Sequence, residues 1–344
     1  MPDSVPPALT NSEDTAAASH ERRAAMESSA FNHQPVMLDE VVELFASVPS
    51  GVVIDATLGG GGHAQALLEA HPNLRLLGID QDEVALAAAG ERLGKFGDRV
   101  QTVHGRFDQL EELFHRLEPW HNQVDAVGVL FDLGVSSPQL DVAERGFSYR
   151  SEGPLDMRMN PSQSLNAEVV VNTYSLGELT SVLARFGEDR HARRVAQAIV
   201  AARPITSTTE LAEIIKYAIP APARRRGGHP ATRTFQAIRI EVNAELDILA
   251  SSLRQAIEVL RSGGRCAVLS YHSGEDRIVK REFLNAESGG CQCPPGLPCV
   301  CGAEPEVRIL RRGGWTPSAV ELERNHRAAS ARLRAVEKLE RGHA

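Results

Sequence analysis

Four consecutive glycines follow a short apolar run in the first third of the chain. The run Val52–Asp55 leads into Gly59–Gly62. Glycines let the backbone turn tightly and approach a ligand, and the helix expected after them would offer free N–H donors. The spacing fits the dinucleotide fingerprint and also the methyltransferase arrangement, in which an acid such as Asp55 ends the first strand. The pattern predicts a nucleoside-cofactor site, but leaves open which cofactor, or a merely flexible loop.

A carboxylate ends the next apolar run. Asp80 stands in the stretch Gly78-Ile79-Asp80-Gln81-Asp82. A carboxylate at this place can accept hydrogen bonds from both hydroxyls of a ribose. It can also act as the N-cap of the following helix. Both interpretations of Asp80 stay open at this point.

A polar loop rich in turn residues follows the fourth apolar run. It begins at Asp132 and continues through the segments 144–148 and 153–159. Such a loop after a buried strand belongs at the mouth of a crevice formed by strand ends. Its residues are therefore expected to face substrate and cofactor.

Four of the five cysteines lie close together as Cys291, Cys293, Cys299 and Cys301, in a Gly/Pro-rich stretch. Four thiolates suit tetrahedral zinc, although a zinc ribbon usually has the spacing Cys-x-x-Cys. A redox-sensitive loop and a variable surface insertion are the alternatives, and we assign no metal site here. The absence of a spread-out disulfide framework and of an export signal favours a reducing cytoplasm.

The elements that must position these residues alternate between apolar runs and amphipathic stretches from residue 51 onward. Strands are expected at 52–56, 74–79, 100–103 and 124–131, and helices at 64–70, 83–93 and 109–117. This rhythm is typical of a parallel sheet covered by helices, with a ligand crevice at the strand ends. No apolar stretch reaches the roughly 18 residues that a membrane span needs.

The rhythm changes after residue 140. Residues 165–262 are expected to be helical, with a cap at 206–209 and a long helix from 232 to 260 that ends at Gly263-Gly264. Strands are expected again at 265–271 and 307–310. We therefore predict an α/β domain of residues 31–140 and 263–344, interrupted by a helical insertion of residues 141–262. Residues 1–30 have no apolar run and are expected to be a disordered arm.

The net charge of −8 is unevenly distributed along the chain. Residues 1–184 hold 11 Lys/Arg and 27 Asp/Glu, whereas residues 185–239 hold 11 basic and 4 acidic residues. Residues 305–344 hold 9 basic and 5 acidic residues. Concentrated positive charge suits a local contact with a polyanion, although solvated helical faces would give the same counts.

Several longer motifs lie between residues 132 and 334. They are DLGVSSPQLD at 132–141, GPLDMRM at 153–159, ATRTFQAIRI at 231–240, SYHSGEDRIVK at 270–280 and NHRAASARLR at 325–334. Through these motifs the chain resembles the RsmH (MraW) family of 16S rRNA cytosine-N4 methyltransferases, over about residues 33–336. Three residues depart from the family pattern: Gly274 replaces Leu, Tyr271 replaces Phe and Asp189 replaces Glu.

The resemblance implies a Rossmann-like class I methyltransferase sheet with an inserted, mainly helical RNA-binding domain. It implies S-adenosylmethionine as cofactor and one cytosine of 16S rRNA, near the ribosomal P site, as target. The resemblance also implies a cytoplasmic location, the small ribosomal subunit as partner and no membrane partner. It leaves a homodimer open. The cofactor contacts that it implies are Gly61, Gly62, His63, Asp80, Phe107, Asp132 and Gln139.

Methyl transfer to an amine is an in-line displacement, so positioning and exclusion of water carry most of the catalysis. A cytosine amine needs acceptors for its N–H bonds, and Asp132 or a carbonyl of residues 136–138 could supply one. His272 is a candidate base or substrate contact, with a structural hydrogen bond as the alternative. Carbon-5 methylation would need a cysteine in the loop after the fourth strand, and none is there.

The target base must leave its stack to reach the crevice. The basic insertion is the expected RNA clamp, through Arg193, Arg194, Arg224, Arg225, Arg226 and Arg233. A nicotinamide-dependent oxidoreductase and a non-catalytic RNA-binding module are the competing hypotheses. Transfer of label from S-adenosylmethionine, an absorbance change with NADH, or RNA binding without turnover would distinguish these three.

Overall fold

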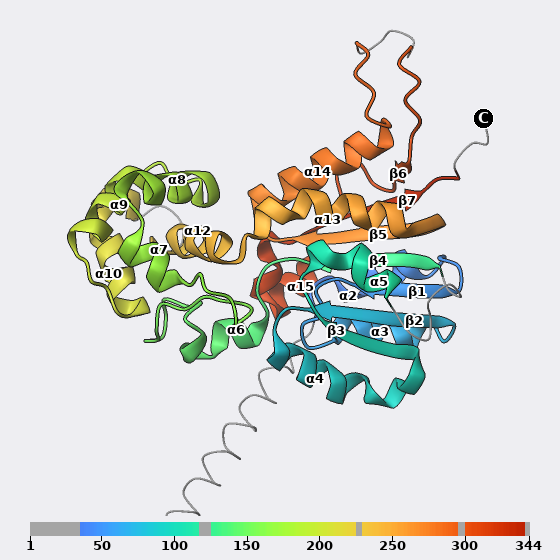
Figure 1. Cartoon of the computed structure of the whole chain (residues 1–344), viewed down its shortest axis with the longest axis horizontal. Helices are drawn as coiled ribbons and strands as arrows, with labels where there is room; N and C mark the ends of the chain where they lie inside the picture. The colour runs from blue at the N-terminus through green and yellow to red at the C-terminus, as the bar shows by residue number, and fades with distance from the viewer. Residues whose placement is uncertain (1–34, 117–124, 225–228, 295–299, 341–344) are drawn as a thin grey trace, which may run out of the picture.

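The apolar runs of the first half of the chain form the parallel part of a central sheet (Figure 1). The computed structural model describes residues 35–116, 125–224, 229–294 and 300–340. The first four strands are β1 (Gly51–Asp55), β2 (Leu74–Asp80), β3 (Val100–His104) and β4 (Ala126–Asp132). Parallel strands with both faces covered have nearly continuous apolar runs, and every residue of β1 is buried. These four expected strands are confirmed to within two residues at each end.

The sheet has seven strands in the order β3-β2-β1-β4-β5-β7-β6. The last three are β5 (Leu260–Ser270), β6 (Val307–Ile309) and β7 (Arg332–Lys338), and β7 runs antiparallel to both of its neighbours. This order with a reversed β7 is that of the Rossmann-like class I methyltransferase sheet, which confirms the predicted fold class. The direction of winding reverses between β1 and β4, so the ligand crevice is expected at their carboxyl ends.

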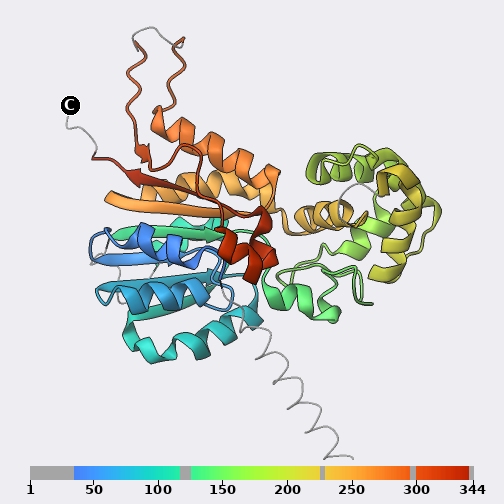
Figure 2. The same cartoon turned by 180° about the vertical axis from the view of Figure 1, so that it is seen from behind.

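Helices cover both faces of the sheet, as the two opposite views show (Figures 1 and 2). Alternate residues of β1 face opposite layers: Val52 and Ile54 pack with one group of helices, and Val53 packs with the other. The first group is α5 (Leu110–His115), α13 (Glu245–Val259) and α14 (Ser273–Glu287). The second is α2 (Leu38–Phe45), α3 (Gly62–Ala70) and α4 (Glu83–Leu93).

A separate lobe of helices stands beside the carboxyl ends of the strands (Figure 1). It has its own apolar core, formed by side chains between Phe147 and Val242. The expected cap at 206–209 is confirmed, because the Ser207 hydroxyl accepts a hydrogen bond from the Glu210 N–H. The helices between the two lobes and within the second are α6 (Ser137–Asp141), α7 (Ala167–Thr173), α8 (Leu176–Gly187), α9 (Ala192–Ala201), α10 (Thr208–Ala218), α11 (Ala221–Arg224) and α12 (Thr232–Asn243).

The single long helix expected from 232 to 260 is wrong. It is divided at Ala244, whose φ of 53° lies in the left-handed region, into α12 and α13. Because α13 packs on the sheet, the helical lobe ends near Ala244 and not at the boundary predicted at 262. The Gly263-Gly264 pair does not end a helix but lies within β5, where the pairing with β4 is irregular.

The C-terminal segment returns to the junction of the two lobes, where Figure 2 shows it in red. It contains α15 (Ala319–Arg324) and a 3-10 turn at His326–Ser330 before β7. No helix in the described ranges combines the length and the apolar character needed to cross a bilayer. The expected arm at 1–30 lies outside the described residues.

Candidate active site

A cavity of about 530 Å³ opens at the carboxyl ends of β1, β2, β4 and β5. Its volume lies within the range of ligand pockets, about 300–1,000 Å³. The glycine loop and Asp80 border one part of it, and Tyr149 and Phe235 of the helical lobe border another. The cavity is therefore shared by the sheet and the insertion.

The glycine loop turns between β1 and α3 in a conformation that requires glycine at two positions. Gly59 has a φ of 51° and Gly61 a φ of 73°, in the left-handed region. Gly61 precedes α3 and provides no side-chain cap. The first N–H groups of this helix therefore remain available as hydrogen-bond donors. Gly62 and His63 border the cavity, whereas Gly61 does not line it and packs next to Leu93.

Asp80 ends β2 and faces the cavity with both carboxylate oxygens engaged by backbone donors. Oδ2 accepts from the Gly59 N–H at 2.7 Å, and Oδ1 accepts from the Asp82 N–H at 2.9 Å. Burial raises the pKa of Asp80 to about 6, against the opposing effect of these N–H groups. The helix-cap alternative is wrong, because Asp82 and not Asp80 caps α4 by accepting from the Val84 N–H.

Phe107, which the resemblance makes a cofactor contact, follows β3 and forms part of the cavity wall. Its ring meets Phe131 edge to face, with centroids 5.9 Å apart. The edge contact with the apolar cluster fixes the orientation of the ring beside the cavity. Phe107 therefore contacts the apolar core and also borders the cavity.

Asp132 ends β4 at the centre of the site, with a side chain 29% exposed. Its Oδ1 accepts from the Tyr271 hydroxyl at 2.6 Å, and its Oδ2 lies 3.5 Å from His63 Nδ1. His63 Nε2 must donate to the Val36 carbonyl at 2.9 Å, since a carbonyl only accepts. Burial raises the pKa of Asp132, and the neighbouring His63 and Tyr271 lower it in part.

Gln139 borders the cavity, but both ends of its amide are already engaged within the protein. Oε1 accepts from the Ser136 N–H at 3.0 Å, and Nε2 donates to Asp82 Oδ2 at 3.0 Å. Arg145 binds the same Asp82 oxygen at 2.8 Å, in an ion pair that is largely buried. The Gln139 side chain thus joins the loop after β4 to the start of α4, and it also borders the cavity.

His272 caps α14 at the border of the cavity. Its Nδ1 accepts from the N–H groups of Gly274 and Glu275 at 3.2 and 3.4 Å, so the ring proton resides on Nε2. Nε2 lies 3.2 Å from Glu275 Oε1 but is not aligned for a hydrogen bond, and has no other partner in the described structure. This geometry leaves the buried Nε2–H without a hydrogen-bond acceptor among the described residues, and leaves no lone pair with which His272 could act as a base.

The departure at Gly274 has a local packing explanation. A Cβ at this position would lie 3.0 Å from the His272 ring and 3.1 Å from Leu246. The glycine therefore leaves room for the His272 ring to fold back over the first turn of α14. Asp189, another departure, accepts from the His191 N–H at 2.8 Å just before α9, away from the cavity.

A buried ion pair beside the cavity was not predicted from the sequence. Arg239 binds Glu245 through two hydrogen bonds of 2.8 and 2.9 Å, and both residues border the cavity. Glu275 accepts from the Tyr271 N–H at 2.7 Å and completes this polar wall. Arg239 and Glu275 lie in the matching stretches at 231–240 and 270–280, so these motifs were the available signal.

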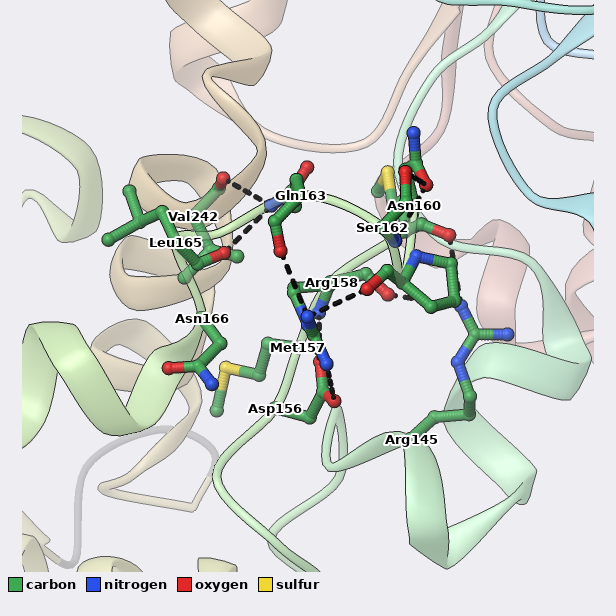
Figure 3. A network of polar contacts seen from close by, with 12 residues as sticks. Arg145, Asp156, Met157, Arg158, Asn160, Ser162, Gln163, Leu165, Asn166 and Val242 are labelled. Carbon is green, nitrogen blue, oxygen red and sulfur yellow. Dashed lines mark hydrogen bonds and ion pairs between the residues drawn. The ribbon is translucent and has the colours of Figure 1, made fainter.

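The segment between the two lobes is held by a polar network rather than by regular structure (Figure 3). Arg158 pairs with Asp156 at 2.8 Å and donates to the carbonyls of Pro161 and Gln163. Gln163 in turn donates to the Val242 carbonyl at the end of α12 at 2.8 Å. These contacts fix the path of the loop that borders the cavity.

Of the six expected clamp arginines, Arg193, Arg194 and Arg233 are exposed on the helical lobe. Arg224 is only partly exposed and stacks over Tyr217 at 5.9 Å. Arg225 and Arg226 lie outside the described residues.

Known proteins resemble this chain over most of its length. The model of the MraW methylase family matches residues 30–339. A "Ribosomal RNA small subunit methyltransferase H" of Symbiobacterium thermophilum is 51% identical over 318 residues, which cover 91% of this chain and 98% of that protein. A protein of the same name from Thermobifida fusca is 50% identical over 314 residues, which cover 89% and 93% of the two chains. The solved structure of an rRNA methylase from Streptococcus thermophilus, at 12% identity and a TM-score of 0.38, covers 88% of this chain and 94% of its own.

Proposed function

The chain belongs to the MraW methylase family, and on that premise we propose that it uses S-adenosylmethionine to methylate the N4 amine of one cytosine in small-subunit 16S rRNA. The family resemblance of its motifs makes cytosine 1402, near the ribosomal P site, the expected target. Such a substrate would make the cytoplasm its place of action. One observation carries the proposal: a single cavity joins the glycine loop and Asp80 to Asp132, His272 and the aromatic side chains of the insertion.

The residues at the sheet end of the cavity fit S-adenosylmethionine. Each Asp80 oxygen has a lone pair left after its backbone bond and can accept from a ribose hydroxyl. The Phe107 ring offers an apolar face for a purine, and the free N–H groups at the start of α3 suit a carboxylate. When bound, the cofactor supplies a methyl group made electrophilic by its sulfonium.

The other end of the cavity suits a flat base extruded from its stack. Tyr149 and Phe235 are in edge contact there, with centroids 5.5 Å apart, and form an aromatic wall. Stacking on such a wall offsets part of the energy of extrusion. We assign base binding to this wall and RNA binding to the lobe that carries it.

Asp132 is the proposed acceptor for the cytosine amine. An N–H···O⁻ bond to Asp132 would favour a pyramidal nitrogen whose lone pair is free to attack. As the product amine loses a proton, Asp132 Oδ2 can accept it, and the raised pKa of this carboxyl suits that role. Tyr271 and His63 hold the carboxylate in place from two sides.

His272 is the proposed donor to the base. Its Nε2–H is buried without a hydrogen-bond partner among the described residues, and the His272 side chain borders the cavity. The exocyclic carbonyl oxygen or the ring nitrogen of cytosine could accept from this N–H once the imidazole turns toward the base. Such a bond would orient the base without any change in the protonation state of His272.

The experiment that tests cofactor and substrate class together is methyl transfer from labelled S-adenosylmethionine to small subunits, naked 16S RNA and large subunits. We expect incorporation into small-subunit RNA alone. The Asp80→Ala variant should bind S-adenosylmethionine at least tenfold more weakly, since lost charge-assisted bonds cost about 1.5–3 kcal/mol each. The exposed Asp98→Ala is the matched control and should bind normally.

Two results would contradict the proposal. Label in large subunits alone would exclude the substrate, and cofactor affinity unchanged in Asp80→Ala would exclude the assigned cofactor orientation. The affinity of the native chain should also fall as the pH drops below about 6, because protonation of Asp80 removes acceptors for the ribose.

A further inference from the structure

A cysteine-bearing extension leaves the body of the molecule between α14 and β6 and rises away from it (Figure 1). The base of the extension is hydrogen-bonded to the end of α14, where the Glu306 N–H donates to the Ala286 carbonyl at 2.9 Å. Neither the cofactor site nor the base-binding wall includes any residue of the extension. The extension therefore needs an explanation other than the methyl-transfer site.

Hydrophobic burial does not explain why the extension is ordered. Within 288–294 and 300–306, the parts that the structure describes, every residue is at least partly exposed, and Val300 is 88% exposed. A segment of this size without an apolar core usually needs a disulfide or a metal to hold its two sides together.

Three cysteines supply such a link. Cys291 and Cys293 lie on the outgoing side of the extension and Cys301 on the returning side, and their three Sγ atoms lie within 4.8 Å of one another. The Sγ atoms of Cys291 and Cys301 are 3.6 Å apart. That separation is far longer than a disulfide of about 2.05 Å. It is close to the roughly 3.8 Å between two thiolates that each lie about 2.3 Å from a tetrahedral zinc.

The backbone supports the thiolate form of these ligands. The Val300 N–H donates to the Cys293 Sγ at 3.4 Å. A metal binds cysteine as the thiolate, and a backbone N–H that donates to the sulfur stabilises this form. An N–H···S bond of this kind also fixes the direction of the sulfur lone pairs.

We propose that Cys291, Cys293 and Cys301 bind one zinc ion, which closes the extension and holds its two sides together. Soft thiolate ligands favour zinc over the hard cations magnesium and calcium. The three thiolates supply three of the four ligands that a closed structural zinc site takes. This site is independent of the methyl-transfer function.

The test is the metal content of the full chain, purified without an affinity tag in the presence of a reductant and measured by mass spectrometry of the elements. We expect about one zinc per chain, released when a mercurial reagent blocks the thiols. Cobalt exchanged into the site should give the charge-transfer absorption of thiolate coordination.

The variant Cys293→Ser should lose the zinc, while its thermal unfolding and S-adenosylmethionine binding stay close to those of the native chain. Cys266→Ala is the matched control, because Cys266 is buried in β5, and it should keep the zinc. Zinc retained in Cys293→Ser would overturn the proposal. So would a native chain that binds no zinc on reconstitution, or one whose Cys291 and Cys301 form a disulfide in place of a metal site.

Discussion

Asp132 shows how much of the site depends on individual side chains from distant parts of the chain. Its three polar neighbours are Thr57, which accepts from its N–H, His63 at the start of α3 and Tyr271 after β5. Burial raises the pKa of the carboxyl, whereas the neighbouring His63 and Tyr271 lower it in part. The pKa of Asp132 should therefore shift when these contacts are changed.

Tyr271→Phe is the substitution that tests this control. Burial and the negative charge of Asp132 raise the pKa of Tyr271, so its hydroxyl stays protonated and donates to Asp132. Without that bond, the pKa of Asp132 should rise further. We expect the acid limb of the pH–rate profile for methyl transfer to move up by about one unit.

The matched control is Tyr174→Phe, which removes a hydroxyl bonded to Glu241 at 2.9 Å within the helical lobe. Its pH–rate profile should match that of the native chain. An unshifted profile in Tyr271→Phe would show that Asp132 does not need to be ionised for the reaction.

Asp55 is buried behind the glycine loop and does not border the cavity. Burial raises its pKa from 3.8 to about 8, despite the bond that its Oδ1 accepts from the Thr57 N–H. The folded state therefore retains a proton that the unfolded chain releases near pH 4. Stability from this group is present below about pH 4 and is lost as the pH rises toward 8, by about 1.4 kcal/mol per unit.

Asp55→Asn should remove this dependence, because the amide carries no titrating proton and can still accept from the Thr57 N–H. Relative to the native chain, the variant should gain stability as the pH rises from about 5 to 8. Urea unfolding at several pH values measures the difference. A constant difference over that range would refute the prediction, and the exposed Asp98→Asn provides the baseline.

At the scale of elements, the loop after β4 is held by a few buried charges. Arg145 pairs with Asp82 at 2.8 Å and donates to the carbonyls of Arg158 and Met159. The C-terminal segment adds a second anchor, since Arg327 bonds to Ser137 and to Asp141. The loop thus connects α4, the helical lobe and the C-terminus around one side of the cavity.

Arg145→Ala should destabilise the chain by about 3–5 kcal/mol. The substitution removes the charged partner of the buried Asp82 carboxylate and the donor to the carbonyls of Arg158 and Met159. Urea unfolding with tryptophan fluorescence measures the loss. The exposed Arg150→Ala is the control and should cost less than about 1 kcal/mol. A loss as small as that control in Arg145→Ala would mean that the pair does not order the loop.

The parallel strands could be predicted from the sequence because burial on both faces makes them continuous apolar runs. β7 escaped detection, because charged residues interrupt it at Arg332, Arg334, Glu337 and Lys338. Two of these are buried in ion pairs, Arg334 with Asp276 and Lys338 with Glu306. Such pairing is a tertiary feature and leaves no local pattern.

The sheet end of the cavity was predictable because the glycine loop and Asp80 follow strands directly. At the other end His272 could be proposed from its motif, whereas Tyr149 and Phe235 could not, because they come from two segments that meet only in the folded chain. The break at Ala244 was missed for a related reason: a left-handed alanine gives no signal of the kind that glycine or proline would.

At the scale of the whole molecule, the basic segment 185–239 lies in the helical lobe, whereas most acidic residues of the segment 1–184 precede that lobe in the sequence. Positive charge on the helical lobe beside the cavity would bring a polyanion toward the active site and keep it away from the sheet. This distribution of charge would allow an overall acidic chain to bind RNA, as we propose.

A double charge reversal on α9, Arg193→Glu with Arg194→Glu, should raise the KM for ribosomal RNA roughly tenfold at moderate salt. S-adenosylmethionine binding should be unchanged, because neither residue borders the cavity. Steady-state methylation at two salt concentrations measures both KM and its salt dependence. Arg116→Glu, on the sheet lobe, is the control. Equal KM values in the two variants would contradict RNA binding by the face of α9.

The measurement that tests the central claim most directly is nucleoside analysis of 16S rRNA methylated by the purified chain, with Asp132→Asn in parallel. The account predicts N4-methylcytidine from one site in the small subunit, and a rate lower by at least tenfold in the variant. Methyl label recovered in any other nucleoside, or no label while S-adenosylmethionine still binds, would contradict it.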